Sequence, residues 1–182
     1  SGLYLDWSCR LVLDGFFSDE MGDFGHDMYV WNSIGSSHQS HSKDGCTILL
    51  KLSQKVADDT EFVWIDTHNT AWHQGLVDGL SVMPMHSFGT EHIASFKWAL
   101  GTQFTGHTHF NGKEIYFTDG VFEDEQVRYT KGSWIRSSAG SHHVPYSKRR
   151  SYNLCKDRAP PDSAPWSPLE PMPLLASSGV HD

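Results

Sequence analysis

The sequence predicts an all-β protein built from two related units, and three observations support this fold class. Short apolar runs are separated by turn signals such as Asp119-Gly120, a dipeptide typical of hairpins. No stretch has the long 3.6-residue periodicity of an amphipathic helix. The segment 11–51 also aligns without a gap on 116–156, 105 residues later, and 13 of the 41 pairs are identical. A repeat of this length indicates a duplicated domain, because solenoid units have only about 20–50 residues.

The repeat divides the chain into a partial first unit at 1–60 and a second unit at 61–156. Strands are predicted at 47–54, 61–66 and 91–100, where apolar and β-branched residues lie between turn residues. The last segment could also form a helix, since its apolar spacing favours neither period. We predict a strand there because the histidine pair that follows it requires a β-frame.

The two ends of the chain have their own signals. The chain opens without a methionine and enters a strand-like pattern at once, which is typical of a truncated or processed N-terminus. The segment 157–182 holds six of the eight prolines. Because proline lacks the backbone donor for ladder pairing and fixes φ, we expect this segment to be a disordered tail.

Composition and charge exclude several classes of function. The 182 residues are 38% hydrophobic and 13% aromatic, which is enough for a sizeable core. The formal net charge of -8 argues against binding to nucleic-acid phosphates. No apolar run reaches the ~20 residues of a membrane span, and no signal peptide opens the sequence. We therefore predict a cytoplasmic protein whose partner is a small-molecule ligand or substrate, not nucleic acid or a membrane, and leave a homodimer open.

The three cysteines are Cys9, Cys46 and Cys155, and no CxxC pair occurs. An odd number at wide spacing supports neither a disulfide framework nor a thiolate zinc site. We expect these thiols to be reduced and structural.

Three histidines in the second unit are candidate metal ligands. His107 and His109 are two residues apart, so on a strand their side chains point to the same face. His143 is the third candidate, and its repeat counterpart is His38. Neutral imidazoles so arranged could bind one cation.

The residues around these histidines resemble the two sequence motifs of the cupin superfamily. The segments concerned are His107-x-His109-x4-Glu114 followed by Gly120, and Gly132-x5-Ser138-Ala139-Gly140-x2-His143. Within that superfamily the chain is similar to the ChrR-like cupins, named for a zinc-binding bacterial anti-sigma factor. The resemblance implies a double cupin of two β-barrel or jelly-roll-like domains, the first incomplete.

The resemblance also implies one divalent metal ion, Fe(II) or Zn, with Mn or Ni as alternatives, bound by His107, His109, His143 and Glu114. It implies a non-haem dioxygenase acting on a small organic molecule, or alternatively a non-catalytic metal- or ligand-binding sensor. In the first unit, Gly2 replaces the first motif histidine, so we expect no metal there.

The family carries its carboxylate ligand where this chain has Lys113. Alternation along the strand would place Lys113 inside the barrel and Glu114 outside, whereas a shift at the turn Asn111-Gly112 would reverse them. The sequence leaves both registers open. Besides Lys113, Arg136 and Tyr146 are predicted to line the substrate pocket, with an outward ion pair and a packing role as their alternatives.

Overall fold

The computed structural model describes residues 8–32, 36, 38–52 and 58–158. Over these residues the chain forms fifteen strands and no helix, so the predicted all-β class is confirmed. The described part of the chain therefore offers no helix long and apolar enough to cross a membrane.

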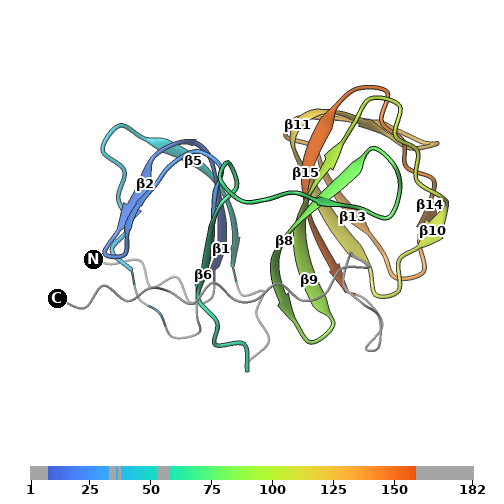
Figure 1. Cartoon of the computed structure of the whole chain (residues 1–182). Helices are drawn as coiled ribbons and strands as arrows, with labels where there is room; N and C mark the ends of the chain where they lie inside the picture. Colours follow the sequence, from blue (N-terminus) through green and yellow to red (C-terminus); the bar gives the residue numbers. More distant parts are fainter. Residues whose placement is uncertain (1–7, 33–35, 37, 53–57, 159–182) are drawn as a thin grey trace.

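The first sheet lies in the N-terminal part of the chain and has four antiparallel strands in the order β5-β1-β4-β6 (Figure 1). The strands are β1 (Ser8–Gly15), β4 (Met28–Trp31), β5 (Cys46–Leu52) and β6 (Val63–Asp66). A separate hairpin consists of β2 (Phe17–Asp19) and β3 (Gly22–Phe24).

The second sheet is larger and forms most of the C-terminal barrel (Figure 1). Its strands run in the order β12-β11-β15-β9-β8-β7, and β13 pairs with β11 off this path. The bounds are β7 (His73–Gln74), β8 (Leu80–Phe88), β9 (Glu91–Trp98), β11 (Lys113–Glu123), β12 (Arg128–Thr130), β13 (Trp134–Ser137) and β15 (Ser151–Arg158). Two short strands, β10 (His107–Thr108) and β14 (His142–His143), pair only with each other.

The repeat seen in the sequence is also present in the strand register. Gly15 pairs with Cys46 in the β1–β5 ladder, and Gly120 pairs with Ser151 in the β11–β15 ladder. Both pairs are related by the offset of 105 residues, and each ladder has one register irregularity just before its glycine. Gly120 has φ +81°, and a Cβ there would lie 2.0 Å from the Arg150 carbonyl oxygen. Asp119-Gly120 is therefore not the hairpin turn that the sequence predicted, because it lies within β11, at an irregular position that only glycine fits.

The structure changes two of the predicted boundaries. The strand β6 pairs with β4 of the first sheet, so the predicted division after residue 60 separates it from the sheet that it joins. Asp157 and Arg158, assigned to the proline-rich tail, instead continue the pairing of β15 with β9. The proline-free sequence up to Arg158 can supply the ladder donors that the later prolines lack. The remaining tail, 159–182, lies outside the described residues, as does the end of the predicted strand 47–54.

The two sheets pack against each other through an apolar layer. The first sheet contributes Cys9, Leu11, Tyr29 and Trp31, and the second contributes Met83, Met85, Ile93 and Leu154. A separate cluster fills the C-terminal barrel, with Val82, Phe96, Ile115, Phe117 and Phe122 among its members. One face of the second sheet is thus directed at the first sheet, and the other face lines the barrel interior.

A buried polar network also joins the elements near this layer. Asp59 Oδ2 accepts a hydrogen bond from Trp31 Nε1 at 3.1 Å and lies 2.8 Å from His86 Nε2. The His86 ring stacks on the Trp31 ring with centroids 4.5 Å apart. Because buried polar atoms must find partners, this network holds β4 of the first sheet against β8 of the second.

Candidate metal centre

The three candidate histidines converge on one point from two strands and a loop. His107 on β10 is the register partner of His143 on β14. His109 lies just past β10, and its backbone is held by two hydrogen bonds. Its N–H donates to the Ser141 carbonyl at 2.9 Å, and its own carbonyl accepts from Gly140 N–H at 2.8 Å. Gly140 and Ser141, which precede His143 in the chain, thus hold the backbone of His109 in place.

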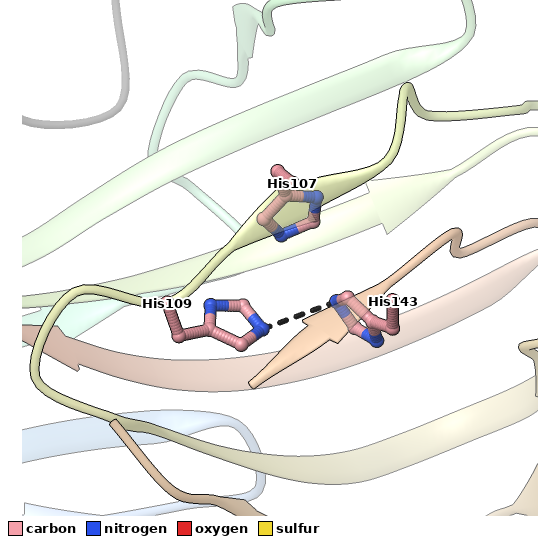
Figure 2. Close-up of side chains that lie close together, drawn as sticks. All are labelled: His107, His109 and His143. Carbon is pink, nitrogen blue, oxygen red and sulfur yellow. Dashed lines mark hydrogen bonds between the residues drawn. The ribbon is translucent and has the colours of Figure 1, made fainter. Parts of the chain in front are cut away.

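Figure 2 shows the three imidazole rings turned toward one another. The ring centroids are 4.8 Å apart for His107 and His109, 4.8 Å for His107 and His143, and 4.9 Å for His109 and His143. One ring nitrogen from each residue lies within 4.8 Å of the other two, and the Nε2 atoms of His109 and His143 are 3.2 Å apart. Two nitrogens that bind one ion at about 2.1 Å are themselves about 3.0–3.4 Å apart, so the donor set fits a divalent metal ion.

A backbone carbonyl selects which nitrogen of His107 faces the site. His107 Nδ1 lies 3.2 Å from the Thr105 carbonyl oxygen. Since a carbonyl oxygen can only accept, Nδ1 carries the proton and Nε2 keeps its lone pair. This is the arrangement by which outer residues orient a metal-binding imidazole. The Phe104 ring, edge-on at 5.0 Å between centroids, packs against the same imidazole.

The surroundings keep all three histidines neutral at pH 7. Burial, followed by the charge of Lys113, lowers the pKa of His109 to about 3. Burial, then the charges of His107 and Lys113, lowers the pKa of His143 to about 4. The pKa of His107 is also lowered, first by burial and then by Lys113. Neutral imidazoles have free lone pairs for metal binding, so the site is prepared for a cation.

The structure settles which of Lys113 and Glu114 faces the barrel interior. Lys113, Ile115 and Cys155 line the same cavity as the three histidines. The β11 register is unbroken from Lys113 to Phe117, and its irregularity comes only between Phe117 and Asp119. No shift therefore occurs next to Asn111-Gly112, and alternation along the strand places Glu114 on the opposite face.

Glu114 faces the layer between the two sheets. It forms an ion pair and hydrogen bond with Lys51 of β5, and its Oε1 lies 3.2 Å from Arg136 Nε. Burial would raise the pKa of Glu114, but the hydrogen bond and charge of Lys51 outweigh it, so the pKa is lowered. This placement removes Glu114 from the predicted ligand set.

Two predicted pocket residues do not line the cavity. The Arg136 side chain is 75% exposed and pairs with Glu114, because its position on β13 directs it to the outer face. Tyr146 bridges Gln103 and Glu123 in isolated β-pairs, and Lys148 Nζ lies 5.4 Å from its ring centroid. Arg136 thus forms the outward ion pair, and Tyr146 has the packing role, that the sequence analysis gave as alternatives to lining the pocket.

The cavity beside the histidines has a volume of about 510 Å³, which is within the usual range for ligand sites. Its walls are mostly apolar and aromatic, with Leu76, Leu80, Phe96, Trp98, Phe104, Phe110, Ile115 and Phe122. Sequence reasoning missed its polar members His92, Asn153, Asp157 and Arg158. Asp157 pairs in register with both Lys113 and His92, a relation that only the order of strands in the sheet could reveal.

Among the described residues, two further groups of possible ligands lie in or beside the first unit. One is Asp19, Glu20 and His38, and the other is the exposed group His26, Asp27 and His68. Arg10 NH1 lies 3.5 Å from Asp19 Oδ2, and a cation next to a carboxylate opposes metal binding there. That no metal binds in the first unit stays a prediction, and His26 and His68 should be replaced in any experiment that counts ions.

The inward position of Lys113 leads to a test with two substitutions. Lys113→Glu should tighten metal binding by tenfold or more, about 1.4 kcal/mol, because it removes a positive charge and adds a fourth ligand. Glu114→Gln should leave metal affinity unchanged, since that side chain faces the other sheet. Calorimetric titration of Zn²⁺ into both variants measures the effects. Weaker binding in Glu114→Gln would contradict the observed register.

The fold and the three-histidine site define this protein as a cupin. More specifically, residues 60–158 match the family described as the ChrR Cupin-like domain. The match covers more than half of the chain, and the protein belongs to the ChrR-like cupin family. No curated protein matches the sequence.

Two solved structures share the fold over most of this chain, and a third is similar over a shorter part of it. A "putative dioxygenase" from Nostoc punctiforme has a TM-score of 0.74 at 13% identity, over 94% of this chain and 68% of that one. A "putative glyoxylate induced protein" from Pseudomonas aeruginosa has a TM-score of 0.69 at 15% identity, over 85% and 67% of the two chains. An acetylacetone dioxygenase from Acinetobacter johnsonii has a TM-score of 0.49 at 19% identity, over 59% and 80%. At these identities the similarity concerns the fold alone.

Proposed function

We propose that this protein is a metal-dependent cupin that binds a small organic molecule and acts on it as a non-haem dioxygenase. The observation that supports this most strongly is the meeting of three neutral imidazoles at the wall of a cavity of about 510 Å³. Imidazole ligands suit Fe(II) and Zn, and also Ni. We propose Fe(II) or Zn as the ion, with Mn or Ni as alternatives.

The roles of the residues follow from their positions. His107, His109 and His143 would hold the ion, which when bound supplies Lewis-acid or redox chemistry that side chains lack. His107 keeps its Nε2 directed to the site through its bond to Thr105. The aromatic walls, among them Phe104, exclude water from a bound ligand and so strengthen polar contacts at the histidines.

A second candidate function is non-catalytic sensing of a metal or small molecule. The position of Lys113 favours it, because a positive charge beside the histidines weakens retention of the ion and makes its binding reversible. A sensor needs such reversible binding, whereas an enzyme keeps its metal through each turnover.

Metal content and oxygen consumption distinguish these candidates. Elemental analysis of protein purified without added metal should find no more than one ion per chain. Fe(II)-reconstituted protein should consume oxygen with some member of a panel of small carbonyl compounds and carboxylates, while His143→Ala should not. Metal binding without oxygen uptake from any compound would favour the sensor. If neither the wild type nor the reconstituted protein holds an ion, the proposed function is wrong.

A further inference from the structure

The charges around the cavity indicate what kind of molecule it takes. With the histidines neutral, the charged side chains that line it are Lys113, Asp157 and Arg158. Arg158 Nε donates to Glu91 Oε1 at 2.8 Å, so part of its charge is offset outside the cavity, by a carboxylate that also pairs with Lys156. Lys113 and Asp157, register partners at the edge of the barrel, offset one another. The lining alone is therefore close to neutral.

A bound divalent ion changes this balance. All three of its ligands would be neutral imidazoles, and the side chain that lies beside them in the cavity is the cationic Lys113. These ligands would leave the ion its full double charge. The carboxylates whose charges reach the triad, Asp157 at His107 and Asp124 and Glu125 at His143, lie outside the group of possible ligands. Most of the remaining wall is apolar, which reduces screening by water. An occupied site therefore favours a ligand that brings an anionic group.

The position of Lys113 shows where that group would lie. Lys113 Nζ is 5.9 Å from the centroid of Phe96, and its charge acts on all three histidines. Lys113 thus lies near both the histidines and the aromatic wall of the cavity. An anionic head that contacts the ion can contact this ammonium at the same time, as a charge-assisted hydrogen bond.

The walls determine the rest of the ligand. Leu80, Phe96, Trp98 and Phe122 line the interior beyond Lys113, and Trp98 and Phe122 pack edge-to-face with centroids 5.0 Å apart. Asn153 on β15 adds an uncharged polar group to this lining. Such a surface accommodates an aromatic or branched apolar body, because any charged group placed there would lose its hydration without a partner.

Resting on the proposed function, we infer that the cavity binds a monoanionic carboxylate or enolate with an apolar, aromatic-sized body, and that Lys113 selects its anionic head. Lys113 then acts as a specificity-determining residue for the ligand, in addition to its effect on the metal.

Phenylacetate and its neutral isostere phenylacetamide test this inference. Both would be titrated into metal-free and Zn²⁺-loaded protein by calorimetry, using the wild type and Lys113→Met, which keeps the length of the side chain without its charge. The loaded wild type should bind phenylacetate at least tenfold more tightly than phenylacetamide. Lys113→Met should lose most of that preference and leave phenylacetamide binding unchanged. Lys97→Met is the matched control, because Lys97 lies on β9 outside the cavity, with Nζ 5.3 Å from the Trp72 ring centroid.

The outcomes separate the inference from the proposed function. If the loaded wild type binds both probes equally, or if Lys113→Met keeps the preference, the inference is wrong although the metal site stands. If no Zn²⁺ binds, the proposed function is wrong. In that case the metal-free proteins test the inference. It holds if the metal-free wild type prefers phenylacetate to phenylacetamide and metal-free Lys113→Met does not, and it is wrong if the two proteins show the same preference.

Discussion

His143→Ala is expected to lower the affinity for Zn²⁺ or Fe(II) by at least about 100-fold. His143 supplies one of three nitrogens at the site, and its Nε2 lies 3.2 Å from that of His109. Loss of a residue that only orients a metal ligand costs roughly 10–100-fold in affinity, and loss of the ligand itself costs more. His107→Ala should have an effect of similar size, because the three rings are nearly equidistant.

The neighbouring residue provides the control for this experiment. His142 is exposed and its Nδ1 lies 3.3 Å from Thr108 Oγ1, away from the triad. His142→Ala should therefore bind metal as the wild type does. All titrations should use a background with His26→Ala and His68→Ala, so that the exposed group in the first unit cannot contribute. Unchanged affinity in His143→Ala would show that the assigned site is wrong.

The pair His107 and His109 could be located from sequence because its spacing is local. His143 lies 34 positions beyond His109, and the repeat and the resemblance to the second cupin motif indicated it. His107 and His109 are two positions apart, with Thr108 between them. The loop that leads into β14 and His143 turns at Gly140, whose φ is +76°. Turn chemistry and alternation along a strand are short-range effects, so they are visible in sequence. The long repeat likewise predicted a duplication, which is present in the β1–β5 and β11–β15 ladders as pairs related by the offset of 105 residues.

The direction of Lys113 and Glu114 could not be predicted, for a different reason. A slip of one residue reverses every side chain of a strand, and only the pairing of β11 with β13 and β15 excludes it. Glu114 is stabilised outside the barrel by Lys51, a residue 63 positions away in another sheet. Packing of the two sheets creates that contact, and no local pattern indicates it.

The cavity walls and the boundary of the first sheet depend on the same kind of long-range information. The strand β6 joins the first sheet by pairing with β4, and the polar residue Asp157 reaches the cavity only because β15 lies between β11 and β9. Sequence patterns identify strands well, but they do not determine which strands become neighbours.

In the first unit, an internal ion pair lies where the second has its triad. His38, the repeat counterpart of His143, has Nδ1 3.5 Å from Asp19 Oδ2, and the same oxygen lies 3.5 Å from Arg10 NH1. The Arg10 guanidinium also lies over the Phe17 ring, 4.4 Å from its centroid. Burial lowers the pKa of Arg10, and the charge of Asp19 opposes that shift. Asp19 thus provides the compensating charge for a buried cation.

Asp19→Ala is therefore expected to destabilise the protein by about 3–5 kcal/mol, the usual cost of leaving one partner of a buried pair alone. The side chains of Arg10 and Asp19 are 2% and 1% exposed. No guanidinium nitrogen of Arg10 has a hydrogen-bond partner among the described residues, so nothing else there would balance the charge. Urea unfolding measures the change in the free energy of unfolding, and the control Asp14→Asn at an exposed position should change that free energy very little.

Replacing both partners, as in Arg10→Met with Asp19→Leu, should recover most of the lost stability, because an apolar pair removes the uncompensated charge. Equal stability of Asp19→Ala and the wild type would show that Arg10 does not depend on this carboxylate.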